Sequence, residues 1–296
     1  MDAGDLRVFE AVARLGGMNR AASELHTVQS NVTARIRQLE EELRTPLFHR
    51  HSRGVALTAA GQRLLPYAAR VRTLLDEARR AVEDDGRPKG LLHIGSLETT
   101  AAIRLSPLLA GYARRYPEVD LALTTGTSAE LIDAVLARRV EGAFVCGPVD
   151  HADLEERVAF GEELVLVTAP GLPSLDGLVV RGELRIIVLR AGCSYRQRLE
   201  SILAERGVVG LRLLELGTIE GIVGCVAAGL GVTLLPRAMV AAAVDEGRVS
   251  VHALPHEDGL VETVFVRRKD AFVSRALTAF LDFARPPAPD QAEAAD

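Results

Sequence analysis

The chain has few cysteines and no long apolar run, and both absences narrow what it can be. Acidic residues, Asp2 and Asp5, occupy the place where a secretion signal would need its apolar core. The longest uncharged run, Gly221 to Pro236, contains four glycines and is too short to span a bilayer. The three cysteines are too widely spaced for a disulfide framework and suit a reducing compartment: Cys146, Cys193 and Cys225. We therefore expect a cytoplasmic protein without a membrane partner.

Motifs that carry catalysis are missing as well. There is no Gly-x-Ser-x-Gly elbow for a nucleophilic serine and no phosphate loop of the Walker type. None of the seven histidines stands at metal-ligand spacing from a cysteine. We therefore predict that the protein is not an enzyme and that it carries neither a metal nor another cofactor.

Lysine is absent from the first 72 residues, yet this segment is basic. It contains 11 arginines against seven acidic residues, a net charge of +4, while the whole 296-residue chain has −5. The remainder must therefore carry −9. A basic segment on an acidic body favours local contact with phosphates over general attraction to nucleic acid. The length allows two or three domains.

The stretch Met18–Leu43 predicts two helices joined by a tight turn at residues 26–28. In the second helix, Val32, Ile36, Leu39 and Leu43 recur at spacings of four, three and four, which makes one apolar stripe. The opposite face carries groups that hydrogen-bond base edges and phosphates: Gln29, Ser30, Asn31, Thr33, Arg35, Arg37 and Gln38. An ordinary helical hairpin with a solvated face fits this pattern equally well. Asn19 is the expected N-cap of the first helix.

The next residues, Pro46–Thr58, predict a short two-stranded wing. Leu47, Phe48, Val55 and Leu57 are placed to pack inward, and the turn lies at residues 52–54. Arg50 and Arg53 are expected near the tip, where they can reach phosphates or a minor groove.

The run from Leu6 to Tyr67 resembles the winged helix-turn-helix of LysR-type transcriptional regulators, a bacterial family. The resemblance rests on LRVFEAVARLGGMNRAASELH, ARIRQLEEEL and PLFHRHSRGVALTAAG. One stretch departs from the family pattern, which has Ser followed by Gln-Pro at the start of the recognition helix. This chain has Val28-Gln29-Ser30 there, which leaves Thr27 to cap the helix.

A long linker helix is predicted at residues 59–85, after the DNA-binding domain at 1–58. The apolar positions form a seam at coiled-coil spacing: Leu64, Ala68, Val71, Leu75, Ala78 and Val82. A dimer is the simplest way to bury this seam, although packing on the same chain remains an alternative. The resemblance supports the dimer. Residues 86–90 form a charged hinge.

From Leu91 onward, strands alternate with helices, which predicts mostly parallel sheets covered by helices. The layout is similar to the family's effector domain, a two-lobed α/β fold of the periplasmic-binding-protein type. By that resemblance, residues 91–284 divide into lobe one (91–161 and 267–284) and lobe two (162–266). The proline- and alanine-rich tail at 285–296 is expected to be disordered.

Four hydroxyl-rich loops follow strands in this region, where open α/β sheets bind ligands. Helix capping alone would also explain their serines and threonines. The resemblance implies that the loops face one cleft between the lobes. Glu98 suggests an amine partner and Arg196 offers a positive charge. The predicted effector-binding residues are Ser96, Glu98, Thr99, Thr100, Thr127, Ser128, Cys193, Ser194, Arg196, Thr218 and Ile219.

These observations predict a LysR-type regulator that binds an interrupted palindrome in double-stranded DNA and responds to a small molecule of unknown identity. A dimer through the linker helix is expected, with a tetramer and contact with RNA polymerase as further candidates. One alternative is a redox sensor that uses Cys193, whose neighbours Arg196 and Arg198 favour the thiolate. The other is a solute-binding protein whose N-terminal region only dimerises.

Overall fold

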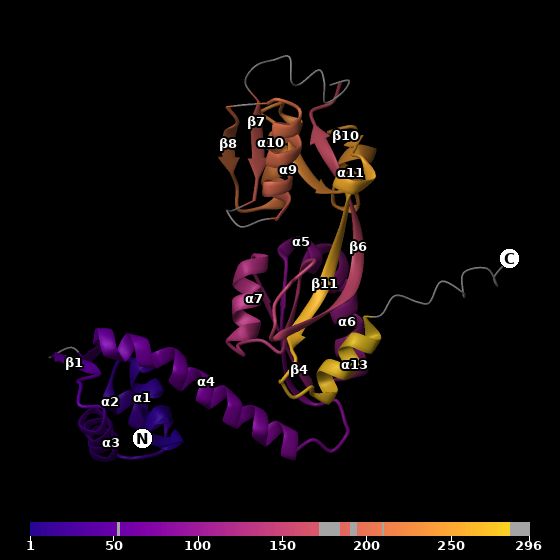
Figure 1. Ribbon diagram of the computed structural model, residues 1–296. Coiled ribbons are helices and arrows are strands. Elements are labelled where there is room, and N and C mark those ends of the chain that lie inside the picture. Colours follow the sequence, from indigo (N-terminus) through magenta and orange to yellow (C-terminus); the bar gives the residue numbers. More distant parts are fainter. Residues whose placement is uncertain (52–53, 172–183, 190–193, 209, 285–296) are drawn as a thin grey trace. The chain divides into compact units, whose positions relative to one another are not determined.

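The computed structural model describes residues 1–51, 54–171, 184–189, 194–208 and 210–284 (Figure 1). These residues form two compact units. The first contains Met1–Gly86 and the short turn 137–139, and the second contains Arg87–Leu136 and the chain from Val140 onward. Within the described part of the chain, no helix is both long and apolar enough to cross a membrane.

The first unit is a helical core followed by a wing and a long helix. Its elements are α1 (Ala3–Leu15), α2 (Met18–Glu24), α3 (Gln29–Glu42), β1 (Phe48–His51), β2 (Gly54–Leu57) and α4 (Ala59–Val82). Helix α1 begins at Ala3, ahead of its buried apolar residues, because Asp2 and Asp5 form a capping box at its N-terminus. Gly17, not Asn19, is the N-cap residue of α2, so the prediction for Asn19 was wrong.

The core of this unit is built from the predicted apolar stripes. Phe9 and Val12 of α1 meet Val32, Ile36 and Leu39 of α3, and all five side chains are fully buried. Leu43, the fourth residue of the α3 stripe, is the C-cap residue and is 36% exposed. Burial of a Val, Leu, Ile or Phe side chain contributes roughly 1.5–3 kcal/mol, so this cluster fixes the orientation of α3.

The apolar seam of the linker helix α4 is packed on the first unit in its first half and exposed in its second half. Ala68 is fully buried in the core of the first unit, and Leu64 and Val71 pack against that core. Further along, Leu75 is 41% exposed and Val82 is 88% exposed. The first half of the seam therefore packs on its own chain, and only the second half is left for a partner. The helix ends at Val82 rather than at about residue 85.

The second unit begins with a strand and then alternates helices with strands. Its first elements are β3 (Gly90–Ser96), α5 (Glu98–Thr100), the π-helix η1 (Ala101–Leu105), α6 (Ser106–Arg115), β4 (Val119–Thr125), α7 (Ser128–Leu136), β5 (Gly142–Cys146) and β6 (Leu154–Thr168). The remaining ones are β7 (Arg185–Val188), α9 (Ser194–Glu205), β8 (Arg212–Glu215), α10 (Ile219–Ala227), β9 (Thr233–Pro236), α11 (Arg237–Asp245), β10 (Ser250–Ala253), α12 (His256–Gly259), β11 (Leu260–Arg268) and α13 (Arg275–Phe283).

The sheets are mixed rather than mostly parallel. A seven-stranded sheet has the order β10-β6-β11-β5-β3-β4, with β9 also paired to β6. Strand β3 is parallel to β4 and β5, whereas β6 and β11 are antiparallel to each other and to their other neighbours. A separate parallel pair is formed by β7 and β8.

Strands β6 and β11 run side by side through both lobes (Figure 1). Residues Leu164–Val167 of β6 pair with β9 in lobe two, while Thr263–Val266 of β11 pair with β5 in lobe one. Thr263–Val266 therefore belong to lobe one and not, as predicted, to lobe two. The sequence signal for the first half of β6 was weak because residues 155–158 are exposed and mostly charged.

Lobe one has an aromatic core between the sheet and two helices. Tyr112 of α6 packs edge-on against Phe280 of α13, and Phe144 of β5 packs against Phe265 of β11. The buried Tyr112 hydroxyl donates a hydrogen bond of 2.8 Å to the Ala276 carbonyl. Burial raises the pKa of Tyr112 to about 12, so the hydroxyl remains protonated and can donate.

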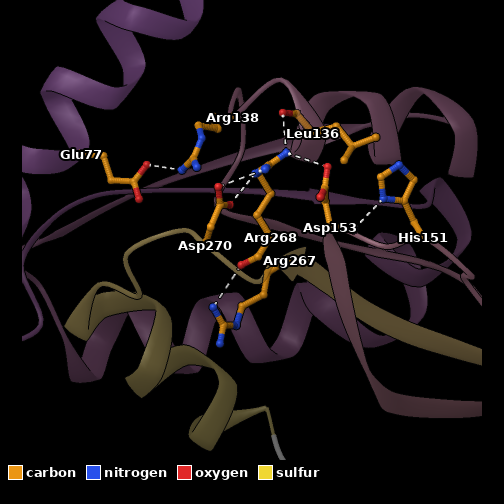
Figure 2. Close-up of polar contacts among 8 residues, drawn as sticks. All are labelled: Glu77, Leu136, Arg138, His151, Asp153, Arg267, Arg268 and Asp270. Carbon is orange, nitrogen blue, oxygen red and sulfur yellow. Dashed lines mark hydrogen bonds and ion pairs between the residues drawn. The ribbon is translucent and has the colours of Figure 1, made fainter.

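Arg268, at the end of β11, joins several segments of lobe one (Figure 2). Its guanidinium donates to both carboxylate oxygens of Asp270, at 2.7 and 3.1 Å, and lies 3.9 Å from Asp153. It also donates to the Leu136 carbonyl at the C-terminus of α7, at 3.4 Å. A largely buried arginine in this position satisfies a helix-end carbonyl and neutralises two carboxylates at once.

Candidate DNA interface and effector site

Helix α3 presents a polar face to solvent because its apolar stripe is buried. Gln29, Ser30, Asn31, Arg37 and Gln38 are exposed, and Thr33 is half-buried. The positive φ of His26 (52°) turns the chain from α2 into α3, and the Thr27 N–H donates to the Ala22 carbonyl at 2.9 Å. This is a helix-turn-helix, which resolves the ambiguity that periodicity left open.

Two polar side chains of this face interact along the helix. The Gln29 amide donates to the Thr33 hydroxyl at 3.3 Å, and the Asn31 amide donates to the Thr27 hydroxyl at 3.0 Å. Val28 is the N-cap residue of α3, and no side chain caps the helix there. Thr27 therefore does not supply the expected backbone cap. Its hydroxyl accepts from Asn31 instead.

Arg35 has a different environment from the one predicted. Its guanidinium donates to Asp5 of α1 at 3.3 Å and lies 3.9 Å from Asp2. The pKa of Asp2 is lowered, mainly by the hydrogen bond from the Asp5 backbone and in part by Arg35. Arg35 thus links α3 to the start of α1, which makes it a positioning residue in this structure.

The wing is attached to the helices through backbone contacts. The Glu40 carboxylate accepts hydrogen bonds from the N–H groups of Leu47 and Phe48, at 2.8 and 3.2 Å. The Val55 N–H donates to the Gly16 carbonyl, and a Cβ on Gly54 would lie only 2.7 Å from the same oxygen. The role of Glu40 in holding the wing could not be predicted, because it depends on where the fold places residues seven and eight positions away.

Of the two predicted wing arginines, the structure describes only the backbone of Arg50. Arg50 pairs with Val55 in the β1–β2 ladder, but its side chain and the whole of Arg53 lie outside the described residues. His49 and His51 are exposed on β1, with ring centroids 6.4 Å apart.

A buried carboxylate ties α1 to the linker helix. The Glu10 side chain is 7% exposed and lies 3.4 Å from Arg14 and 3.7 Å from Arg72 of α4. Arg14 also pairs with Glu24 of α2, which raises the pKa of Arg14 and lowers that of Glu24. These pairs hold α1, α2 and α4 together behind the exposed face of α3.

The first group of predicted effector residues lies at one edge of the sheet in lobe one. Ser96 pairs with Thr125 of β4 and with Phe144 of β5, so the carboxyl ends of three parallel strands lie together. Ser128 accepts a hydrogen bond of 3.2 Å from the Cys146 N–H. Cys146 is the last residue of β5 and is partly exposed at this edge.

Some of the predicted hydroxyls in this group have local partners. Ser96 is fully buried and donates to the Leu97 carbonyl at 3.0 Å. At the start of α7, the Glu130 carboxylate accepts hydrogen bonds from the Thr127 N–H and hydroxyl, at 2.9 and 3.0 Å, and the Thr127 hydroxyl accepts from the Glu130 N–H at 3.3 Å. Thr99 and Thr100 are buried, whereas Glu98 is exposed.

The second group lies on the elements of lobe two. Thr218 caps α10 by accepting from the Gly221 N–H at 3.2 Å, and Ile219 packs against the apolar core. Arg196 pairs with Glu200 at 3.0 Å and Glu215 at 3.6 Å. Cys193 and the side chain of Ser194 lie outside the described residues. Thr218 therefore does what the capping alternative predicted.

An ion pair between a partly exposed arginine and a buried carboxylate, at the crossover between the lobes, was not predicted. Arg104 of η1 makes two hydrogen bonds to Glu162 of β6, at 2.8 and 3.3 Å. The Glu162 side chain is 5% exposed, and this interaction raises the pKa of Arg104. The two residues are 58 positions apart in the sequence, so no local pattern predicts the pair.

Two family models together match most of the chain. The model described as "Bacterial regulatory helix-turn-helix protein, lysR family" matches residues 3–62, and "LysR substrate binding domain" matches residues 85–287. The former covers α1 to the start of α4, and the latter covers the two-lobed domain.

Curated relatives match nearly the whole length. The "HTH-type transcriptional regulator GltR" of Bacillus subtilis (strain 168) is 45% identical over 280 residues, 95% of each chain. The "HTH-type transcriptional regulator YofA" of the same organism is 44% identical over 282 residues, 95% of this chain and 98% of that protein. Neither the redox sensor nor the solute-binding alternative is favoured by these matches.

Solved structures share the fold. A full-length OxyR variant from Pseudomonas aeruginosa aligns with a TM-score of 0.68 and 20% identity, over 96% of this chain and 94% of that chain. Full-length CbnR complexed with its target DNA aligns with a TM-score of 0.65 and 23% identity, over 96% and 98%. With its helix-turn-helix, its two-lobed effector domain and these matches, the chain belongs to the LysR family of DNA-binding transcriptional regulators.

Proposed function

We propose that this regulator reads its operator with the exposed face of α3 and changes transcription when a small molecule binds its two-lobed domain. The observation that carries the proposal is the exposure of Gln29, Ser30, Asn31 and Arg37 on one face of a helix anchored by buried Val32 and Ile36. Gln29 and Asn31 would contact base edges, and Arg37 would contact phosphates, together with Arg50 and Arg53 of the wing. The cytoplasm is where such a protein meets DNA.

A dimer that places two α3 helices on an interrupted palindrome fits this role. The proposed interface is the second half of α4, because Leu74 is 44% exposed, Leu75 is 41% exposed and Val82 is 88% exposed. Apolar side chains that are exposed in a row along a helix favour association with a second copy. Tetramer formation and contact with RNA polymerase are further steps that this geometry permits.

Two substitutions separate base reading from phosphate contact. We expect Gln29→Ala to cost about 1–3 kcal/mol of binding free energy and to relax preference at one base position. Arg37→Ala should weaken binding to every sequence and lower the slope of log affinity against log salt by about 1. Fluorescence anisotropy with DNA flanking the protein's own gene, against scrambled DNA at several salt concentrations, measures both effects.

Arg248→Ala is the matched control, since Arg248 is a half-exposed arginine of the second unit. It should leave affinity and salt slope unchanged. If Gln29→Ala and Arg37→Ala behave like this control on a sequence that the wild-type protein prefers, α3 is not the recognition helix.

The effector is proposed to bind at the carboxyl ends of β3, β4 and β5, beside Ser128 and Thr100. Residues on the elements of lobe two, namely Arg196, Thr218 and Ile219, would complete the pocket, and no cofactor is proposed. A screen of small carboxylates and amines by thermal shift should find a compound that raises the melting temperature and alters operator binding.

Ser128→Ala should abolish or weaken the shift produced by that compound. Ser106→Ala, another serine-to-alanine change in lobe one, should not. A compound whose binding is equally strong in both variants would place the effector elsewhere.

A further inference from the structure

Val28 stands at the start of the recognition helix with its side chain in water. It is 65% exposed, more than most of the large apolar residues that the structure describes as exposed. It has extended backbone angles as the N-cap residue of α3, directly before the exposed Gln29 and Ser30. The Val28 isopropyl group therefore lies next to the polar groups expected to read bases.

No contact among the described residues of the free protein accounts for a valine at this position. Helix N-caps favour Ser, Thr, Asp or Asn, because a side-chain oxygen accepts a hydrogen bond from a free N–H of the first turn. Valine cannot do this, and the neighbouring Thr27 hydroxyl accepts from the Asn31 side chain instead. Val28 thus contributes no cap and little burial to the stability of α3.

DNA offers an apolar surface at this place. Residues at the N-terminus of a recognition helix contact base edges in the major groove, where thymine alone presents a methyl group. We propose that Val28 is a specificity-determining residue that packs on the C5-methyl group of one thymine in each half-site. The proposal rests on α3 being the recognition helix and adds a base preference at one position.

The test deletes single methyl groups from the DNA. The probe is the tightest-binding duplex that the wild-type protein selects from a random pool, with each thymine replaced in turn by deoxyuridine. Wild-type affinity should fall about fourfold at one thymine per half-site, the effect of removing one buried methyl group. Val28→Ser should bind thymine and deoxyuridine at that position equally well.

Val28→Ser should also change the stability of the DNA-binding unit, and in the opposite direction to its effect on DNA binding. A serine restores the N-cap hydroxyl, so the melting temperature of the DNA-binding unit should rise while the thymine preference disappears. Val158→Ser, a change at a 56% exposed valine of the second unit, is the matched control and should keep the full response to deoxyuridine.

Two failures are distinguishable. If deoxyuridine has no effect at any position while Gln29→Ala still weakens binding, α3 reads the DNA and the proposal for Val28 is overturned. The same holds if Val28→Ser retains the wild-type response. If Gln29→Ala is also without effect, the assignment of α3 itself fails.

Discussion

Replacement of Gly61 by alanine is expected to destabilise the DNA-binding unit by about 2 kcal/mol or more. Gly61 lies in the first turn of α4, and an added Cβ would be 2.3 Å from the Leu47 carbonyl oxygen and 2.8 Å from a Leu57 methyl group. Overpacking of this kind typically costs about 1–3 kcal/mol, and here the closest atom is backbone that cannot rotate away.

The Leu47 carbonyl is held in place from a second direction. It accepts a hydrogen bond of 2.9 Å from the Thr58 N–H, while the Thr58 hydroxyl donates to the Pro46 carbonyl at 2.7 Å. The same hydroxyl accepts from the Gly61 N–H at 3.1 Å. An alanine must therefore displace the junction between β1, β2 and α4, so the clash should outweigh the gain of about 1 kcal/mol in helix propensity.

Gly224→Ala is the matched control, because Gly224 is an exposed helical glycine of α10 with open space around it. This variant should be stabilised by roughly 0.5–1 kcal/mol, so the two substitutions should change the free energy of unfolding in opposite directions. Native-state hydrogen exchange resolves the two units separately, with protection in α1 and α3 reporting on Gly61. Equal stabilisation by both alanines would contradict the close approach of Leu47.

The second large effect is expected at the Arg104–Glu162 pair in the effector domain, in which the carboxylate is buried. Arg104→Gln should cost about 2–3 kcal/mol, because it leaves the Glu162 carboxylate buried without its charged partner. This cost is below the roughly 3–5 kcal/mol typical of fully buried pairs, since the Arg104 side chain is 40% exposed and partly screened by solvent. The Arg104 guanidinium also lies 6.0 Å from the Phe160 ring centroid, a contact that glutamine loses.

The adjacent residue provides an internal control for this prediction. Glu163 is held by Arg237 through two hydrogen bonds of 2.8 and 2.7 Å, but both side chains are more than 40% exposed. Arg237→Gln should therefore cost less than about 1 kcal/mol. Adding Glu162→Gln to Arg104→Gln should recover most of the free energy of unfolding lost in Arg104→Gln alone, which a double-mutant cycle would measure. Equal losses of unfolding free energy in Arg104→Gln and Arg237→Gln would show that the burial of Glu162 does not determine the strength of its ion pair.

Local pattern was enough to predict the helices of the first unit, the wing and an α/β domain, whereas the two-lobed layout was implied by the family resemblance and the mixed sheets were not predicted. The stripe of Val32, Ile36 and Leu39 depends only on helical geometry, and each of these residues is fully buried as that geometry requires. The wing was predictable because Gly54 permits a positive φ at the turn, which few other residues tolerate. Alternating elements after residue 90 likewise indicated an α/β domain.

Contacts between residues far apart in the chain could not be predicted in this way. Arg35 shares the polar face of α3, yet it binds Asp5 because the fold places the start of α1 beside it. Leu64 and Leu75 both belong to the apolar seam of α4, but Leu64 packs on the core of its own unit and Leu75 is 41% exposed. Glu162 and Glu163 are neighbours with the same charge, and the strand buries one and exposes the other.

The sequence by itself determined which faces of each element are apolar and which are polar, because helical and strand periodicities act over a few residues. Only the tertiary structure decided which partner each face meets, since that depends on where distant segments are brought together. For this protein the distinction separates Gln29, Asn31 and Arg37, which remain exposed and are proposed to contact DNA, from Arg35 and Arg104, whose charges hold the fold in place.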